Sequence, residues 1–297
     1  MSTAPLSRRA LLQVCVGVST MSSVGAGVLI PDRESSLSRM ESQLGGRVGV
    51  FALDTGSGKR LAHRENERFA MCSTFKWVLA AATLASVESG GVSLDEELDF
   101  DASDILEYAP ITARHVAEGK MTVRALCSAM ITVSDNTAAN LLFRKLGGPG
   151  KVTAFARSCG DSITRMDRIE PDLNENAHGD PRDTTTPRAM VELMRRVLGG
   201  KALAESSRDL LVDWMVACET GMYRLRAGVP QDWRVGDKTG SGQRGASNDV
   251  AIFYPPGRMP ILVAVYMSES DALGAAVAAA QARIASLIVQ GTDGRQD

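Results

Sequence analysis

The chain has 297 residues, and its 33 lysines and arginines nearly balance its 35 aspartates and glutamates, for a formal net charge of −2. This balance gives no reason to expect a nucleic acid or an anionic membrane surface as a partner. Hydrophobic residues make up 44% of the chain, which is ordinary for a globular protein with a real core, and the length allows one or two domains.

Residues 1–27, approximately, are interpreted as an export signal. Residues 7–13 (SRRALLQ) look like a twin-arginine signal, and an apolar run of small residues follows to about Ile30. Cleavage near Ala26 or Gly27 would leave 297 − 27 = 270 residues in the periplasm. The alternative is a basic tail before a short buried helix. Cys15 lacks a convincing lipobox, which makes a lipid anchor a minor alternative. The apolar stretch is short for a membrane span, so we expect no membrane association of the mature form.

After this segment, the hydrophobic pattern predicts two strands, a long helical region, three strands and a last helix. This order indicates an α+β fold: a five-stranded antiparallel sheet with terminal helices (residues 31–65 and 213–297) and an inserted all-helical domain (66–212). The predicted elements are helices at 33–44, 75–88, 123–133, 138–146, 152–158, 188–198, 207–217 and 272–289, and strands at 47–54, 59–63, 233–238, 248–254 and 261–267.

Ser73 and Lys76 lie at the start of the predicted helix that ends before Gly90-Gly91. Residues three apart on a helix are neighbours, so Lys76 is expected beside the Ser73 hydroxyl. A serine needs a nearby base to become a nucleophile, and a helix N-terminus favours a developing oxyanion. The alternative is a helix-capping serine with an unrelated lysine.

Two polar triplets follow, each with an ordinary structural alternative. Ser134-Asp135-Asn136 is either an inter-helix turn or a site where Ser134 passes a proton to a leaving nitrogen and Asn136 binds a substrate carbonyl. Lys238-Thr239-Gly240 is either a charged segment before a glycine bulge or a strand edge that presents Lys238 and Thr239 to a carboxylate. In the second case the N–H of Ser241 would be an oxyanion donor.

The order of these motifs resembles that of the class A serine β-lactamases. Residues 165–174 (RMDRIEPDLN) resemble the family's Ω-loop, which residues 180–187 (DPRDTTTP) close, and the likeness spans roughly residue 35 to the end of the chain. It implies a cofactor-independent hydrolase that opens the β-lactam amide of penicillins and cephalosporins through a serine acyl-enzyme and so confers antibiotic resistance. It also implies a monomer that binds β-lactam substrates and clavulanate-type inhibitors.

Glu170 distinguishes a β-lactamase from the other serine acyl-enzymes that bind penicillin. The resemblance gives Glu170 the role of activating the water that hydrolyses the acyl-enzyme, with Asn174 holding the same water. Without that step the chain would be a penicillin-binding DD-peptidase or a β-lactam sensor domain. By the same resemblance, Arg168 and Asp183 form the ion pair that closes the Ω-loop. Whether Glu170 or Lys76 is also the acylation base stays open.

The remaining site residues are implied by the resemblance alone. Tyr108 matches an aromatic wall at the mouth of the cleft. Ser247 occupies the place where many relatives have an arginine for the substrate carboxylate, and Arg224 matches the substitute arginine of other members. Arg244 is expected to point outward from its strand. Ser241 is expected to add a hydroxyl to the carboxylate site, which favours cephalosporins.

The cysteines and histidines predict neither disulfides nor a metal site. Cys72 and Cys127 each match one half of a bridge found in some relatives, but Gly242 and Ala80 stand at the partner positions. Four free, mostly buried thiols are therefore expected in the mature chain. The three histidines are scattered without ligand spacing, so we expect no bound metal.

Overall fold

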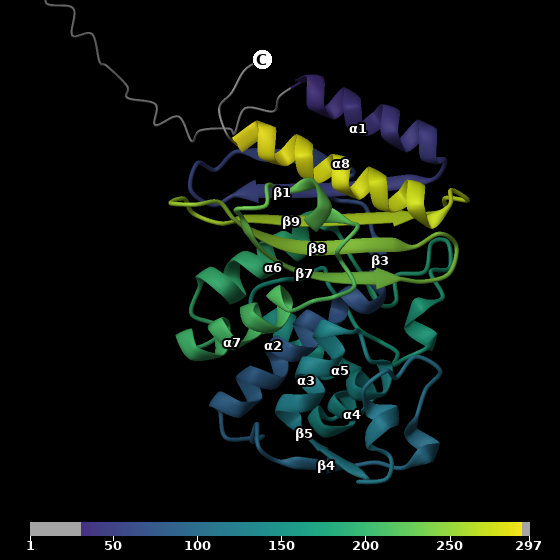
Figure 1. The fold of residues 1–297 in the computed structure, drawn as a ribbon, viewed down its shortest axis with the longest axis vertical. Coiled ribbons are helices and arrows are strands. Elements are labelled where there is room, and N and C mark those ends of the chain that lie inside the picture. Colours follow the sequence, from purple (N-terminus) through teal and green to yellow (C-terminus); the bar gives the residue numbers. More distant parts are fainter. Residues whose placement is uncertain (1–30, 293–297) are drawn as a thin grey trace, which may run out of the picture.

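The computed structural model describes residues 31–292, with side chains from residue 35 onward. The predicted export signal and Cys15 lie outside this part. A five-stranded antiparallel sheet in the order β2-β1-β9-β8-β7 runs across the molecule (Figure 1), which confirms the predicted fold class. Its strands are β1 (Arg47–Asp54), β2 (Arg60–His63), β7 (Arg234–Ser241), β8 (Ser247–Tyr254) and β9 (Ile261–Ser268).

The sheet has a different partner on each face. Along β1, Val50 belongs to the core beneath the terminal helices α1 (Pro31–Leu44) and α8 (Gly274–Thr292), whereas Phe51 belongs to the core shared with the helical segment. This alternation follows from the two-residue period of a strand. The first strand of the sheet in the sequence, β1, pairs with the last, β9, along its whole length, from Arg47↔Ser268 to Asp54↔Ile261. The sheet therefore forms only when both ends of the chain meet.

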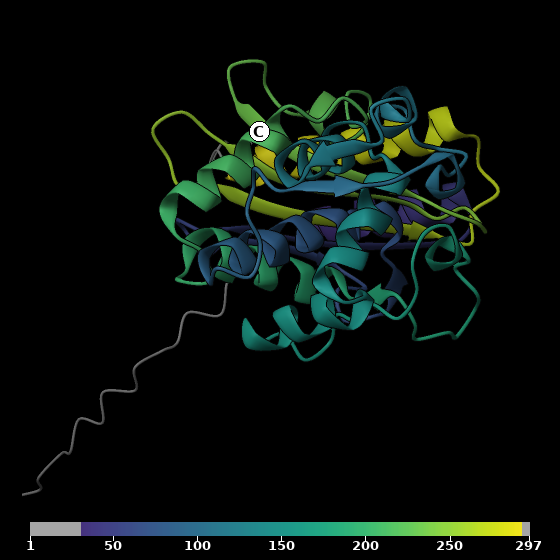
Figure 2. The same cartoon turned by 90° about the horizontal axis from the view of Figure 1, so that it is seen from below.

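The segment between β2 and β7 forms the other layer, which lies in front of the sheet when seen from below (Figure 2). It is mainly helical, but two short antiparallel ladders and several 3₁₀ turns interrupt it, all too short to produce a sequence period. Its helices are α2 (Phe75–Glu88), α3 (Val123–Thr132), α4 (Asn136–Leu146), α5 (Pro149–Ser158), α6 (Pro187–Gly199) and α7 (Glu205–Val216). The ladders pair β3 (Phe69–Ala70) with β6 (Thr184–Thr185) and β4 (Glu97–Asp99) with β5 (Lys120–Thr122). The 3₁₀ turns are η1 (Cys72–Thr74), η2 (Ala102–Asp104), η3 (Thr112–His115), η4 (Asp172–Asn174) and η5 (Leu225–Gly228).

Strand β7 is longer than predicted and carries the Lys-Thr-Gly triplet inside the ladder. Gly240 pairs with Asn248, so the interpretation of this glycine as a bulge is wrong. A Cβ on Gly240 would lie 2.9 Å from Met71 O and 3.1 Å from Ser73 N. Glycine is required there because the edge strand approaches the backbone of η1 this closely.

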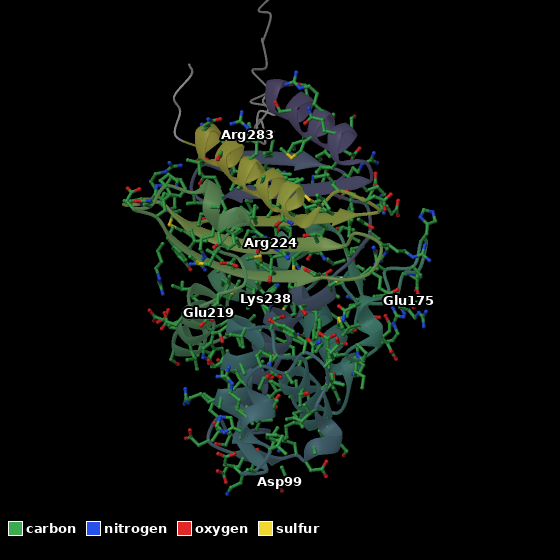
Figure 3. All side chains as sticks on the ribbon, turned by 45° about the vertical axis from the view of Figure 1, so that its right-hand side comes forward. Asp99, Glu175, Glu219, Arg224, Lys238 and Arg283 are labelled. Carbon is green, nitrogen blue, oxygen red and sulfur yellow. The ribbon has the colours of Figure 1, made fainter. Side chains whose placement is uncertain are left out.

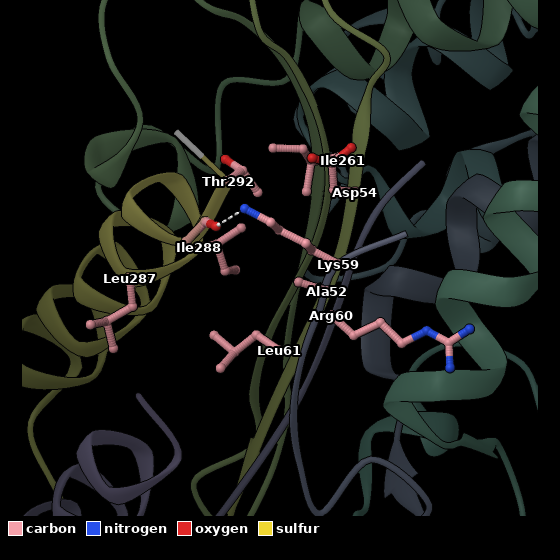
Figure 4. Close-up of a pocket in the computed structure, with 10 residues that line it drawn as sticks. Ala52, Asp54, Lys59, Arg60, Leu61, Ile261, Leu287, Ile288 and Thr292 are labelled. Atoms are coloured by element: carbon pink, nitrogen blue, oxygen red, sulfur yellow. Dashed lines mark hydrogen bonds between the residues drawn. The ribbon is translucent and has the colours of Figure 1, made fainter. Parts of the chain in front are cut away.

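Two cations hold the C-terminal end of α8 against the sheet. Lys59 Nζ donates a hydrogen bond to Gly291 O (3.3 Å, Figure 4), and Arg258 Nη2 donates one to Thr292 O (3.1 Å). Positive charge at this position complements the last carbonyls and the helix dipole. The hollow beside them measures about 20 Å³, room for about one water molecule, and lies on the terminal-helix face of the sheet.

The four cysteines of the described part are free, as predicted: Cys72, Cys127 and Cys218 are buried and Cys159 is half-buried. Between residues 31 and 292, no group of three or more His, Cys, Asp or Glu side chains is arranged to hold a metal ion. Within the same range, no helix has the length and apolar character needed to cross a bilayer.

Candidate active site

Ser73 lies in η1, immediately before α2, with its side chain at the floor of a cleft. The cleft has a volume of about 400 Å³, within the usual range of small-molecule sites. The predicted residues that it brings together come from both layers of the fold. Its lining consists of Ser73, Tyr108, Ser134, Asn136, Asn174, Thr220, Arg224, Thr239, Gly240 and Ser241.

The Ser73 hydroxyl donates its hydrogen bond to Glu170 Oε1 (3.4 Å), not to the lysine one turn along α2. Lys76 is fully buried, and its Nζ contacts Glu170 Oε1 (3.1 Å), Ser134 O (2.8 Å) and Asn136 Oδ1 (2.5 Å). Glu170 therefore bridges the serine and the lysine. The two groups that could accept the serine proton form one contiguous network.

Burial dominates the electrostatics of Lys76. The loss of hydration lowers the pKa of its ammonium group below the usual value, against the opposing pull of the Glu170 carboxylate. A lysine that gives up its proton more easily than an exposed one is a better candidate base. This environment is produced by the apolar helix α2, which is buried over its first ten residues.

Ser134 sits between the two lysines of the site. Lys238 Nζ donates to Ser134 Oγ at 3.0 Å and Lys76 Nζ lies 3.4 Å from the same atom. Burial lowers the pKa of Lys238 to about 8, and the positive charge of Lys76 adds to the shift. The Ser134 hydroxyl thus has a proton source on either side, as the proposed relay to a leaving nitrogen requires.

The turn that carries Ser134 is fixed by its neighbour in the triplet. Ser134 has a left-handed backbone (φ 63°), and Asp135 caps α4 by accepting from Ala138 N (2.9 Å). The other Asp135 oxygen accepts from the backbone N–H groups of Ile111 and Thr112 (3.0 and 2.9 Å). Asp135 therefore holds the loop near Tyr108 to the turn that carries Ser134. Tyr108 itself is 51% exposed at the mouth of the cleft, where it was predicted.

Glu170 and Asn174 lie together on the Ω-loop. Asn174 Nδ2 donates to Glu170 Oε2 (2.5 Å), and among the described residues Asn174 Oδ1 is buried without a hydrogen-bond partner. An orphaned buried acceptor beside a carboxylate is a natural place for an ordered water that donates to both. This geometry fits the predicted role of the two side chains in holding the hydrolytic water.

The predicted ion pair of the Ω-loop is present. Arg168 Nε donates to Asp183 Oδ2 at 2.6 Å, and Asp183 is fully buried. Asp183 Oδ1 also accepts from the backbone N–H groups of Asp167 (2.8 Å) and Arg168 (2.9 Å). Removing one partner of such a buried pair costs about 3–5 kcal/mol, because a charge is left behind without compensation.

The groups predicted to bind the substrate carboxylate converge at the end of β7. Thr239 and Ser241 share one face of the strand because they are two residues apart. Arg224 reaches this end with Nη2 on Ser241 Oγ (2.9 Å) and Nη1 on Asn248 O (2.8 Å). Figure 3 labels Arg224, which lines the cleft, and Lys238, which is fully buried within β7. Arg224 thus lines the cleft beside Ser241, the position from which it is predicted to bind the substrate carboxylate.

The pairing of β7 with β8 fixes the positions of Arg244 and Ser247. Ser241 pairs with Ser247, so residues 242–246 form the turn between β7 and β8, and Arg244 is exposed on that turn with φ 51°. Arg244 points outward as predicted, but it does so from a turn rather than from an alternating strand position. Ser247 accepts from Gln281 of α8 through its backbone oxygen (3.0 Å).

Three polar residues that support the site had no predicted role. Asn140 exchanges two hydrogen bonds with the Glu170 backbone, from Nδ2 to Glu170 O (2.9 Å) and from Glu170 N to Oδ1 (3.0 Å). Asn248 Nδ2 donates to Ala70 O (2.9 Å) just before η1. The Thr220 hydroxyl lies 2.5 Å from that of Thr239. Of these three, only Asn140 could have been found from the sequence, because it lies one helical turn after Asn136 and so on the same face of the helix.

Comparison with known proteins decides the family. A model of the β-lactamase enzyme family matches residues 32–292. The chain belongs to the class A β-lactamases. β-Lactamase L2 of Stenotrophomonas maltophilia is 51% identical over 229 residues, which are 77% of this chain and 75% of that protein. The carbapenem-hydrolyzing β-lactamase KPC of Klebsiella oxytoca is 45% identical, covering 83% of this chain and 85% of that protein.

Solved structures agree with this assignment. A class A β-lactamase described as the last common ancestor of Gram-negative bacteria superposes with a TM-score of 0.85 at 54% identity, covering 86% of this chain and 97% of that chain. This class A β-lactamase is accordingly a hydrolase that acts on β-lactams, and the resistance function predicted from the sequence follows from that activity.

Proposed function

We propose that this class A β-lactamase hydrolyses penicillins and cephalosporins through a covalent acyl-enzyme on Ser73. The observation that carries the proposal is the place of Glu170, whose Oε1 lies 3.4 Å from Ser73 Oγ and 3.1 Å from Lys76 Nζ. A carboxylate so close to the nucleophile can activate the water that releases the acyl group, a step that must be fast in a β-lactamase, whereas a penicillin-binding DD-peptidase or a sensor domain stays acylated by the β-lactam.

Acylation would begin when the Ser73 oxygen attacks the lactam carbonyl and loses its proton. Glu170 Oε1 accepts the Ser73 hydrogen bond directly, and Lys76 Nζ contacts the same oxygen, so the proposal holds with either as the base. The backbone N–H groups of Ser73 and Ser241 would stabilise the oxyanion, and Asn136 would bind the side-chain carbonyl of the substrate. Ser134 would then deliver a proton to the departing lactam nitrogen, supported by the Lys238 contact at 3.0 Å.

Deacylation would use the polar space between Glu170 and Asn174. A water there would lose a proton to Glu170 while it attacks the ester carbonyl of the acylated serine, and Ser73 would recover its proton as the ester breaks. The Arg168–Asp183 pair at 2.6 Å supports this step by keeping the Ω-loop in place, since a misplaced water loses rate steeply.

Nitrocefin turnover by the purified mature protein tests the proposed activity. We expect many equivalents of nitrocefin to be opened per enzyme molecule. A single equivalent followed by persistent covalent labelling would instead identify a penicillin-binding protein or a sensor.

The substrate range is expected to centre on penicillins and the earlier cephalosporins, with slow turnover of carbapenems and acylation of Ser73 by clavulanate-type inhibitors. Ser241 favours cephalosporins, and Gly242 replaces the cysteine of the carbapenemase bridge. A Cβ at position 242 would lie 2.6 Å from Cys72 Sγ, so the two positions face each other while the Cys72 thiol is free. Steady-state kinetics with benzylpenicillin, a cephalosporin and imipenem check this order, and efficient imipenem hydrolysis would contradict it.

Arg224→Ala is expected to raise KM for penicillins by about tenfold or more, because a charged partner of the substrate carboxylate is lost. Inactivation by clavulanate should weaken in parallel. Arg244→Ala is the matched control: it removes an exposed arginine from the neighbouring turn and should change KM little. A larger effect at Arg244 than at Arg224 would refute the assignment of the carboxylate subsite.

Two further proposals come from the sequence. Export by the twin-arginine-type signal would place the mature enzyme in the periplasm, where β-lactams meet their targets. The enzyme is expected to act as a monomer, as the family resemblance implies.

A further inference from the structure

Two buried acids lie side by side next to the carboxylate subsite. Asp237 on β7 and Asp249 on β8 occupy adjacent antiparallel strands, in which Thr239 pairs with Asp249 and Asp237 pairs with Ala251. The acids are therefore diagonal neighbours on one face of the sheet. Asp237, Thr239 and Ser241 lie on the same face of β7, so the acid pair lies next to the residues expected to bind the substrate carboxylate.

Each acid has one oxygen paired and one oxygen orphaned. Asp237 Oδ1 accepts from Arg226 Nε (2.9 Å), and Asp249 Oδ2 accepts from Leu225 N (3.2 Å). Asp237 Oδ2 and Asp249 Oδ1 are buried without a hydrogen-bond partner among the described residues. Both side chains have no exposed surface. Leaving two buried acceptors unpaired is costly, and two adjacent carboxylates repel each other as well.

One proton removes both costs. Placed between the two orphaned oxygens, it would turn them into donor and acceptor of a single hydrogen bond and would cancel one of the two buried charges. Burial, and then the negative charge of Asp237, raises the pKa of Asp249 well above its usual range. Burial likewise raises the pKa of Asp237, against the opposing attraction of Arg226.

The surroundings keep water away and leave the pair with cationic neighbours. A Cβ at Gly221 would lie only 1.8 Å from Asp237 Oδ2, so the backbone of this loop closes directly over the carboxyl group. On helix α8, which packs on this face of the sheet, the one charged side chain is Arg283, and it is exposed. The titratable and charged groups that act on the pair are Arg226, Lys238 and the Cys218 thiol at Asp237, and Arg224 and Lys238 at Asp249.

The hydrogen bonds that Asp249 and Asp237 accept come from Leu225 and Arg226, the two residues that follow Arg224 in the chain. Asp249 holds the backbone N–H of Leu225, and Asp237 holds the side chain of Arg226. We propose that Asp237 and Asp249 share a single proton and that this hydrogen-bonded acid pair positions Arg224 for the substrate carboxylate. The acids touch no substrate and act through Arg224, so they are positioning residues. The kinetic consequence rests on the proposed function, whereas the shared proton does not.

The shared proton is tested directly by infrared difference spectroscopy at neutral pH on the folded wild type and Asp249→Asn. The wild type should show the carbonyl band of a buried, protonated carboxylic acid that shifts on exchange into heavy water. Asp249→Asn should lose this band, because the amide supplies the hydrogen bond without a titratable proton. Asp213→Asn is the control for loss of an acid, since Asp213 is 66% exposed and pairs with Arg234; it should keep the band.

The positioning role is tested by steady-state kinetics with benzylpenicillin. Asp249→Asn keeps a donor toward Asp237 and an acceptor for Leu225 N, so KM should stay within about twofold of the wild type. Asp249→Leu removes both the donor and the acceptor, so KM should rise about tenfold with a smaller change in kcat. A tenfold rise corresponds to the loss of about one hydrogen bond to a charged group.

Retention of the acid band in Asp249→Asn would overturn the shared proton, whatever the enzyme's activity. Equal KM values for Asp249→Asn and Asp249→Leu would overturn the positioning role. If Asp249→Leu does not fold, Asp249→Ser serves in its place, because its short hydroxyl side chain cannot span the same two partners. Loss of all β-lactam turnover in the wild type would count against the proposed function and would leave the infrared result standing.

Discussion

Ser73→Ala is expected to abolish β-lactam turnover and leave the fold intact. The change removes only the hydroxyl, whose hydrogen bond to Glu170 is long at 3.4 Å, so little stability depends on it. Loss of the nucleophile costs other serine hydrolases about 10⁶-fold in kcat, and a similar fall is expected here. Nitrocefin and benzylpenicillin hydrolysis, with thermal unfolding measured alongside, check both halves of the expectation.

Ser89→Ala is the matched control for this variant. Ser89 caps the opposite end of α2, its hydroxyl donates to Ser86 O (3.1 Å) on the exposed side, and it does not line the cleft. It should keep the wild-type rate. If Ser73→Ala also kept that rate, Ser73 would have no part in the mechanism.

Glu170→Ala is expected to accept penicillin onto Ser73 and release it slowly. Acylation retains Lys76, Ser134 and the oxyanion donors, whereas the water-activating carboxylate is lost. Removal of a general base typically slows the step by about 10²–10⁴-fold, so the acyl-enzyme should accumulate. Intact-mass spectrometry after mixing with benzylpenicillin should find one persistent adduct in this variant.

Asp172→Ala provides the control for Glu170→Ala, because it removes an exposed acid from the same loop two residues away. Its adduct should be as short-lived as that of the wild type. Failure of Glu170→Ala to acylate at all would show that Glu170 is needed for the first step too. An equally persistent adduct in the wild type would make Glu170 a bystander.

Much of the site could be predicted because its residues lie in short motifs on regular elements. Lys76 follows Ser73 by less than one helical turn, and Lys238, Thr239 and Ser241 lie on one continuous strand, so local spacing alone brings them near one another. The sheet was also predictable, since the long strands carry strongly apolar patterns. The family resemblance then added Glu170, Arg168 and Asp183 from a loop that has no period.

What could not be predicted depends on contacts between distant segments. The hydrogen bond of Ser73 to Glu170, rather than to Lys76, depends on how deeply the Ω-loop inserts. Asn140 supports Glu170 across 30 positions of sequence. Asp237 and Asp249 become neighbours only through the register of β7 and β8, and buried acids in apolar strands give no warning of a partner. The two short ladders are too brief to show alternation.

A time course of intact mass for the wild-type enzyme mixed with excess benzylpenicillin, quenched in acid and mapped to its peptides, tests the central claim most directly. We predict an adduct on the peptide that contains Ser73 at the earliest times, which disappears while many equivalents of penicillin are hydrolysed. Hydrolysis without any adduct on that peptide, or an adduct that persists after one equivalent, would contradict an acyl-enzyme that Glu170 helps to release.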